Sequence, residues 1–136
     1  MLSQLKVHHV GIACFSIEES KIFYEQIGYE ASDIMDDQIQ DIRICFLEKK
    51  DMPRLELLAP IDEASPVNRI LQTQGVTPYH ICYETTDLDV MTKILRQEKF
   101  VRVSKAVPAC AIDNQRVVFL YRKDVGLIEL VEVKGI

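Results

Sequence analysis

The sequence predicts an α+β protein built from two βαβββ modules that arose by internal duplication, because segments far apart in the chain repeat each other. Residues 43–58 (RICFLEKKDMPRLELL) and residues 116–131 (RVVFLYRKDVGLIELV) align without a gap and are identical at seven of sixteen positions. The identities include Glu56 and Glu129, which lie inside the apolar runs LELL and IELV. Each half of the chain therefore ends in a similar strand pair that carries an acid in an apolar context.

A second correspondence lies at the start of each half. When His9 is set against His80, the strand-like segment VHHVGIAC (7–14) falls on PYHICYET (78–85). Alternating and continuous apolar residues of this length are typical of strands. Each module is therefore predicted to open with a strand that carries one histidine.

A helical pattern follows each opening strand, in residues 16–28 and 87–99. In the first helix the apolar residues Ile22, Phe23 and Ile27 recur at helical spacing. The residues that precede the helices, Ser16 and Asp87, are typical N-caps. Glycine at position 28 is typical of a helix C-terminus.

Three strand-like segments then follow each helix, which completes the βαβββ order. They are YEASDIM, DIRICFLE and RLELLA in the first half, and FVRVSKA, QRVVFLYR and GLIELVEV in the second. Between the halves, residues 64–75 predict a connecting helix with Ser65 as N-cap, Pro66 at its first position and Gly75 beyond its end. We expect one domain over residues 1–136, with module one at 5–61, the connecting helix at 64–75 and module two at 76–134.

Composition narrows the classes of function. The chain of 136 residues has a net charge of −5, which argues against nucleic-acid binding, and it contains no basic stripe. No apolar stretch is long enough for a membrane span, and the first residues lack the apolar region of a signal peptide. We therefore expect a cytoplasmic protein with no membrane contact.

Its four cysteines have no CxxC spacing and are interpreted as buried free thiols, with a reactive Cys110 as the alternative.

Strand alternation assigns faces to the repeated His and Glu residues. Successive side chains of a strand point to opposite faces, so the leucines beside Glu56 and the isoleucine and leucine beside Glu129 point away from the acids. His9, Glu56, His80 and Glu129 are then expected on the face that the helices do not cover. Two imidazoles and two carboxylates suit a divalent transition metal. Taken singly, each residue has an ordinary alternative, such as a core histidine or a glutamate on a solvent-facing strand.

The segments HHVGIAC, LELLAP, YHICYE and RVVFLYRKDVGLIELVE resemble the vicinal oxygen chelate superfamily, which includes glyoxalase I, methylmalonyl-CoA epimerase, extradiol dioxygenases and bleomycin-resistance proteins. The resemblance implies paired βαβββ modules that form a cup-shaped mixed sheet around a metal ion. It also implies that His9, Glu56, His80 and Glu129 are the metal ligands, with Co, Ni, Mn or Zn as the metal. His8 is expected to point toward the helices.

Within the superfamily the chain is most similar to methylmalonyl-CoA epimerases, through LELLAPIDEASPVNRILQTQG and YHICYE. Two ligand glutamates speak against extradiol dioxygenases, and intact ligands speak against bleomycin-resistance proteins. Glyoxalase I shares the two-His, two-Glu pattern and is the main competitor. The chain departs from epimerases in residues 108–116, at Tyr79 and at Tyr121–Arg122, which are expected to lie in loops that meet the substrate.

The resemblance implies a metal-dependent isomerase or lyase that stabilises an enolate, acting on an acyl-CoA or on a glutathione hemithioacetal. Glu129 or Glu56 is the expected base, with Glu84 as a second candidate on the face of His80. Arg43 and Arg116 are expected at the rim of the cup, where they either bind substrate or pair with Asp or Glu. A non-catalytic small-molecule or antibiotic-binding protein is the alternative of another class. The resemblance to the superfamily also implies a homodimer.

Overall fold

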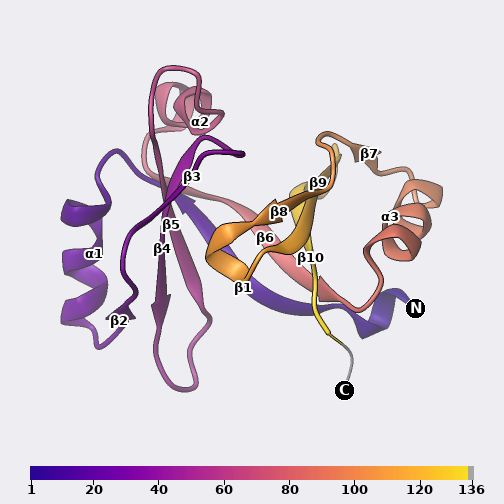
Figure 1. The fold of residues 1–136 in the computed structure, drawn as a ribbon, viewed down its shortest axis with the longest axis horizontal. Helices are drawn as coiled ribbons and strands as arrows, with labels where there is room; N and C mark the ends of the chain where they lie inside the picture. Colours follow the sequence, from indigo (N-terminus) through magenta and orange to yellow (C-terminus); the bar gives the residue numbers. More distant parts are fainter. Residues whose placement is uncertain (135–136) are drawn as a thin grey trace. The chain divides into compact units, whose positions relative to one another are not determined.

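The computed structural model describes residues 1–134, which divide into two compact units (Figure 1). One unit comprises residues 9–79. The other joins residues 1–8 to the chain from residue 80 onward, and is called the 80–134 unit below. The chain thus passes between the units after residue 8 and again after residue 79. The assignment of one domain over the whole chain stays a prediction.

The 9–79 unit holds the first module and the connecting helix. Its strands follow the order β2-β4-β5-β1, and β3 also pairs with β4. β1 and β5 are parallel, whereas β4 is antiparallel to β5, β2 and β3. The elements are β1 (Lys6–Ala13), α1 (Ile17–Gln26), β2 (Glu30–Ala31), β3 (Met35–Asp37), β4 (Ile42–Glu48), β5 (Leu55–Pro60) and α2 (Val67–Gln74).

The 80–134 unit repeats this arrangement with the order β6-β10-β9-β7, and with β8 also pairing β9. β6 and β10 are parallel, whereas β9 is antiparallel to β10, β7 and β8. The elements are the short 3-10 helix η1 (Leu2–Gln4), β6 (Thr77–Thr85), α3 (Leu88–Gln97), β7 (Val101–Arg102), β8 (Val107–Ala109), the 3-10 helix η2 (Cys110–Ile112), β9 (Gln115–Arg122) and β10 (Gly126–Glu132).

The predicted α+β class and the duplicated βαβββ modules are confirmed within the described residues 1–134, which contain ten strands and three α-helices. Two details differ. The strands predicted at 29–35 and 100–106 are instead pairs of short strands, β2 with β3 and β7 with β8, so each module has one break more than expected. The positions expected in substrate loops, Tyr79, Tyr121 and Arg122, lie in β6 and β9.

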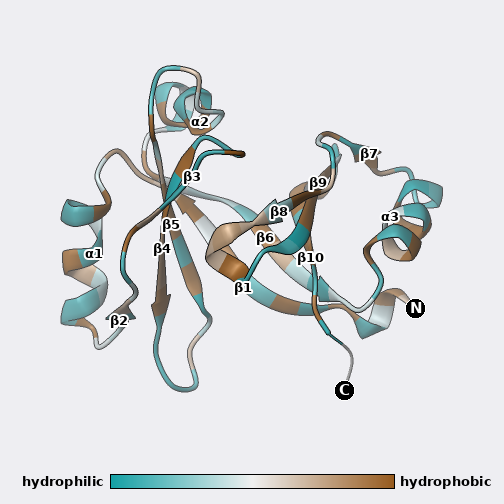
Figure 2. Ribbon diagram, viewed as in Figure 1, coloured by the Kyte–Doolittle hydropathy of each residue, from teal (hydrophilic) through white to brown (hydrophobic). Residues whose placement is uncertain are grey.

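Each unit has a core on the face of its sheet that the helix covers. In the 9–79 unit Leu57 is fully buried in a cluster with Ile12 and Ile17, and in the 80–134 unit Leu130 is fully buried in a cluster with Leu88. Burying one such leucine side chain contributes about 1.5–3 kcal/mol. Figure 2 shows brown and teal residues alternating around α3, as expected of a helix with one face on the sheet.

The first helix covers its sheet less completely than its apolar spacing suggested. Ile17 is the buried residue of α1, whereas Ile22, Phe23 and Ile27 are 53%, 59% and 41% exposed. The helix therefore contributes to the core mainly through its first turn, with Tyr24 packed against the cluster farther along.

The predicted N-caps are confirmed for two helices and wrong for the third. Ser16 accepts a hydrogen bond from the backbone N–H of Glu19, and Asp87 accepts one from Val90. α2 begins at Val67 with Pro66 in the cap position, one residue later than predicted. Among the described residues, the buried hydroxyl of Ser65 has no hydrogen-bond partner. Ser65 therefore precedes α2 but does not cap it.

The two serines make a matched test of these cap assignments. Ser16→Ala should lower the free energy of unfolding by about 1 kcal/mol, because it removes the cap of α1. Ser65→Ala should leave the stability unchanged or raise it, because it removes a buried hydroxyl that makes no hydrogen bond. Urea denaturation followed by circular dichroism measures both. An equal loss in the two variants would contradict the assignment.

Candidate metal centre

The first His–Glu pair lies in the 9–79 unit, where β1 runs parallel to β5. Glu56 is in register with Gly11, and His9 is on the same face of β1 two residues earlier. The imidazole Nε2 of His9 lies 3.1 Å from Oε1 of Glu56. Both residues are buried, at 0% and 4% exposure. Phe46, directly opposite Glu56 on β4, places its ring 5.3 Å from the imidazole in an edge contact.

The 80–134 unit repeats this pair. Glu129 is in register with Cys82 on the parallel strand β6, and His80 again precedes that partner by two residues. His80 Nε2 lies 3.2 Å from Glu129 Oε1, and both residues are buried, at 3% and 4% exposure. Phe119, opposite Glu129 on β9, places its ring 5.2 Å from the imidazole. Strand register, separation and aromatic contact therefore agree between the units.

The two phenylalanines belong to the site and were missed by the sequence reasoning. Phe46 and Phe119 are identical positions of the repeat, to which the sequence analysis assigned no role. The informative signal was that each lies ten residues before a glutamate of the pair. In the structure the two rings pack edge-on against the imidazoles and restrict their orientation.

The donor set of each pair fits a transition metal. A buried ionised carboxylate costs several kcal/mol unless a positive group or a metal compensates it. Glu56 and Glu129 avoid the helix-covered cores, as alternation predicts, yet they are still buried beside imidazoles. Imidazole nitrogen and carboxylate oxygen are ligands that suit divalent ions such as zinc, nickel or cobalt. Each pair therefore supplies two ligand atoms of suitable chemistry.

Glu84, the second candidate base, is on the predicted face of β6 but lies far from the pair. It is four residues after His80, which corresponds to about 13 Å along a strand. There it lines a separate cavity of about 480 Å³ together with Lys6 and Lys134. The structure therefore does not bring Glu84 together with the His80–Glu129 pair.

Arg43 does not lie on the face of the sheet that carries His9 and Glu56. This position corrects the expectation that it lies at the rim of the cup. It alternates with Cys45 and Leu47, which belong to the core under α1. Its guanidinium lies 3.1 Å from Asp36 and 3.5 Å from Glu18, in the first turn of α1. The alternative interpretation, an arginine that pairs with acids, therefore describes it.

Arg116 has the same arrangement in the 80–134 unit. It therefore does not lie at the rim of the cup, as the sequence had led us to expect. It alternates with Val118 and lies on the α3 side of β9. Its guanidinium is 3.0 Å from Glu132 and 3.3 Å from Asp89, in the first turn of α3. The hydrogen bonds that Arg116 donates to Glu132 and Asp89 raise the pKa of its guanidinium group. Glu132 in turn accepts the backbone N–H of Leu88, so the ion pairs fasten the start of α3 to the sheet.

A short segment packs beside the His80–Glu129 pair. Residues 107–112, which form β8 and η2, place Ala109 in a buried cluster with Cys82, Val117 and Val131. Cys82 is the strand neighbour of Glu129, and Val131 is on the same face of β10 as Glu129. The segment that departs from the epimerase pattern therefore borders this pair.

Three of the four cysteines are buried free thiols as expected, and Cys110 is not fully buried. The buried thiols are Cys14, Cys45 and Cys82, whereas Cys110 lies in η2. Burial raises the pKa of the Cys14 thiol to about 11. Because the thiolate is the reactive form, Cys14 is a packing residue at neutral pH.

Comparison with known proteins identifies the family. A family model described as the Glyoxalase/Bleomycin resistance protein/Dioxygenase superfamily matches residues 8–119, which include His9, Glu56 and His80. The chain belongs to this superfamily. The resemblance predicted from the sequence is thereby confirmed.

Among curated relatives, the mitochondrial methylmalonyl-CoA epimerase of Dictyostelium discoideum is 29% identical, over 93% of this chain and 78% of the relative. The uncharacterized protein YqjC of Bacillus subtilis is 25% identical, over 96% and 94%. The chain is also similar to solved structures of epimerases. That of Mycobacterium tuberculosis aligns with a TM-score of 0.83 and 28% identity, over 95% of this chain and 88% of that one.

A variant of the Streptomyces coelicolor methylmalonyl-CoA epimerase in complex with 2-nitronate-propionyl-CoA aligns with a TM-score of 0.81 and 27% identity, over 96% of this chain and 98% of that one. The α+β fold predicted from the sequence therefore matches the fold of these epimerases. Over residues 1–134, none of the helices combines the length and the apolar character that a membrane-spanning helix requires.

The ion pair of Glu132 predicts a pH-dependent contribution to stability. The hydrogen bond from Arg116 and the N–H of Leu88 lower the pKa of Glu132 below its ordinary value of 4.5. A lowered pKa means that the ionised form stabilises the fold above pH 4.5, and that this contribution is lost as the pH falls through the folded-state value. Glu132→Gln should therefore cost about 1 kcal/mol at pH 7.

The cost of Glu132→Gln should shrink as the pH falls below 4.5, because the parent carboxyl then becomes protonated as well. Urea denaturation at pH 7 and at pH 3.5 measures this change. Glu63→Gln, which changes an exposed acid that has no ion pair in the described chain, is the matched control and should have no effect at either pH. A cost for Glu132→Gln that does not vary with pH would contradict the assignment.

Proposed function

We propose that this protein is an epimerase of the methylmalonyl-CoA epimerase type. In this proposal one divalent metal ion is held jointly by the two His–Glu pairs, namely His9, Glu56, His80 and Glu129. The reaction removes a proton from the carbon between a thioester carbonyl and a carboxylate, and returns it on the opposite face.

The observation that carries the proposal is the agreement of the two pairs. Each has a histidine two residues before the strand partner of its glutamate, a contact of 3.1 or 3.2 Å, and a phenylalanine against the imidazole. A single buried His–Glu contact is common as a structural feature of cores. A duplicated one, in a superfamily whose name includes metal-using enzymes, favours a shared ion with four protein ligands.

A bound divalent ion would supply Lewis-acid stabilisation of the negative charge that develops on the thioester oxygen. The protein's own residues have the remaining tasks. A carboxylate is needed as base, and we assign this role to Glu129 or Glu56. Both lie on rigid central strands, where neighbouring side chains fix their position. Burial excludes water from them, which strengthens their interaction with a bound substrate.

The proposed substrate class follows from the relatives. The compared epimerase structures include complexes with 2-nitronate-propionyl-CoA and with methylmalonyl-CoA. We therefore propose an acyl-CoA with a carboxylate next to the thioester. A hemithioacetal of glutathione, the glyoxalase I substrate, is the second candidate, because glyoxalase I shares the pattern of two histidines and two glutamates. A homodimer and a cytoplasmic location stay predictions.

Two assays on the same preparation decide between these reactions. In deuterated water, methylmalonyl-CoA should lose its α-proton to solvent at an enzyme-dependent rate, measured by NMR. The hemithioacetal of methylglyoxal and glutathione should be converted at least about 100-fold less efficiently in kcat/KM, a difference of about 2.7 kcal/mol in transition-state stabilisation. The reverse preference would establish the glyoxalase reaction. Absence of both activities from protein loaded with metal would support the binding protein instead.

A matched pair of variants tests the metal ligands. Glu129→Gln should abolish proton exchange and lower the bound metal from about one equivalent to less than about a tenth, because a neutral amide replaces a carboxylate ligand. Glu132→Gln makes the same change on the same strand but on the opposite face, and should retain the metal. Inductively coupled plasma mass spectrometry measures the content of Co, Ni, Mn and Zn.

Thermal unfolding gives a second reading of metal binding. Removing the metal with a chelator should lower the melting temperature of the parent protein, since an ion present at 100 times its Kd stabilises the fold by about 2.7 kcal/mol. The same treatment should leave Glu129→Gln unchanged. If Glu129→Gln binds metal as tightly as the parent does, the proposed site is wrong.

A further inference from the structure

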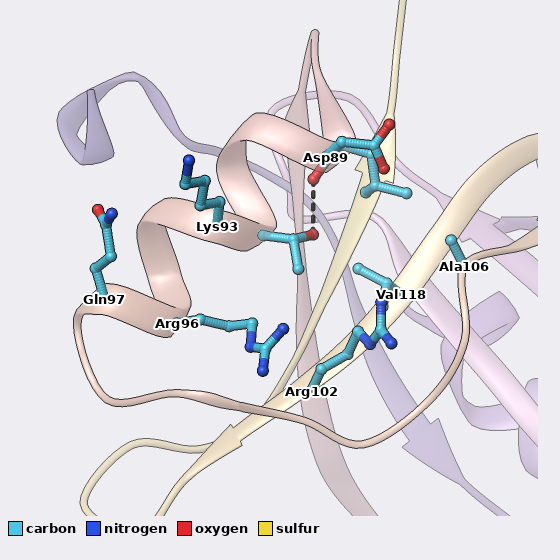
Figure 3. Close-up of a pocket in the computed structure, with 9 residues that line it drawn as sticks. Asp89, Lys93, Arg96, Gln97, Arg102, Ala106 and Val118 are labelled. Atoms are coloured by element: carbon cyan, nitrogen blue, oxygen red, sulfur yellow. Dashed lines mark hydrogen bonds between the residues drawn. The ribbon is translucent and has the colours of Figure 1, made fainter.

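A cationic cavity lies in the 80–134 unit on the α3 side of the sheet. Its volume is about 470 Å³, within the range typical of small-molecule sites. Lys93 and Arg96 line it from α3, and Arg102 lines it from β7. Figure 3 shows Arg96 extending from the helix toward Arg102, so that two guanidinium groups from different elements reach the same space.

The positive charge of this cavity is not balanced by the protein. Asp89 is the acid that lines it, and Asp89 already binds Arg116 through two contacts of 3.3 and 3.4 Å. Within the described chain, no ion pair or side-chain hydrogen bond engages Lys93, Arg96 or Arg102. Three cations gather here although the whole chain has a net charge of −5.

Ordinary structural roles account for only part of this arrangement. Arg96 is in the last turn of α3, where the helix dipole favours a cation. Lys93 is exposed on the same helix and is solvated. Arg102 is exposed as well, but it comes from a different element, the two-residue strand β7, and Figure 3 shows its guanidinium group beside Val118 in the cavity. An anion in the cavity would interact favourably with the positive charges of both arginines and of Lys93.

We propose that this cavity binds the phosphate groups of a small phosphorylated molecule, such as a nucleoside diphosphate. Planar guanidinium groups match phosphate oxygens with paired hydrogen bonds, and Lys93 adds a third positive charge. The cavity is larger than a phosphate alone requires, and the buried side chains of Leu88 and Val118 give it an apolar floor for the organic part of the ligand. The Thr92 hydroxyl donates to the Leu88 carbonyl at 2.6 Å, so the cations are the main donors.

The site is separate from the proposed metal centre. Val118 faces the cavity, whereas the next residue of β9, Phe119, contacts His80 on the opposite face. The strand therefore lies between the phosphate site and the His80–Glu129 pair. A substrate bound at that pair and a ligand in this cavity occupy different faces of the same sheet.

Titration calorimetry of the 136-residue, metal-loaded protein with ADP, and separately with inorganic pyrophosphate, tests the proposal. Both should bind, and binding should weaken as the ionic strength rises. Arg96→Gln and Arg102→Gln should each reduce the affinity for ADP about 10-fold or more. Arg69→Gln, which changes an exposed arginine of α2 outside the cavity, is the matched control and should bind ADP like the parent.

Two further measurements exclude other binding modes. Glu129→Gln should bind ADP with unchanged affinity, which shows that the phosphates do not bind through a metal ion. Protein saturated with methylmalonyl-CoA should also bind ADP unchanged, which shows that the cavity does not hold the nucleotide end of that thioester. The proposal is overturned if ADP and pyrophosphate fail to bind at millimolar concentration, if the two arginine variants bind like the parent, or if methylmalonyl-CoA excludes ADP. Circular dichroism verifies that each variant is folded.

Discussion

The burial of a carboxylate against an imidazole inside a sheet is the constraint on which the rest of each unit depends. Glu56 and Glu129 are almost inaccessible to water, and a carboxylate in that position is tolerated only beside a partner that compensates its charge. A parallel neighbour supplies that partner, because β1 and β6 bring His9 and His80 alongside. Parallel pairing needs a crossover connection, which α1 and α3 provide. The βαβββ order thereby places each histidine on a strand parallel to the strand of its glutamate.

The alternation of side chains along each strand separates two tasks. On one face Leu57 and Leu130 complete the cores under the helices, and on the other the glutamates meet the imidazoles. A shift of register by one residue would exchange these faces and place an acid in the core. Arg43 and Arg116 oppose such a shift, since each binds an acid in the first turn of the helix that covers its sheet. The helices are thus fastened at their N-terminal ends, where a nearby acid is also favourable for the helix dipole.

The sequence was sufficient to predict the fold and to place the two histidines and two glutamates on the face that the helices do not cover, because both follow from a repeat and from a period of two. The same period places Arg116 on the face of Val118 and away from Phe119, whereas the expected position at the rim rested on its match with Arg43 in the repeat. Glu84 is on the predicted face, but its spacing of four residues from His80 in one strand already implied a separation of about 13 Å. Ser65 failed as a cap because α2 begins one residue later, after Pro66, and such boundaries depend on backbone geometry. Both the phenylalanine contacts and the cavity beside α3 depend on tertiary packing that a pattern does not contain.

Strand β9 shows how one element can serve two sites of different chemistry. Phe119 faces His80, Val118 faces the cationic cavity, and Arg116 fastens α3, which supplies two cations to that cavity. A substitution in β9 that changes its position would therefore affect both faces, whereas a side-chain change on one face need not reach the other. We therefore expect substitutions within β9 to be poorly tolerated and substitutions in the segments beside it to be better tolerated. Residues 107–112 form one such segment, beside the His80–Glu129 pair. Differences in specificity between related chains are expected there, because a loop can change its contacts without moving the strands that carry His80 and Glu129.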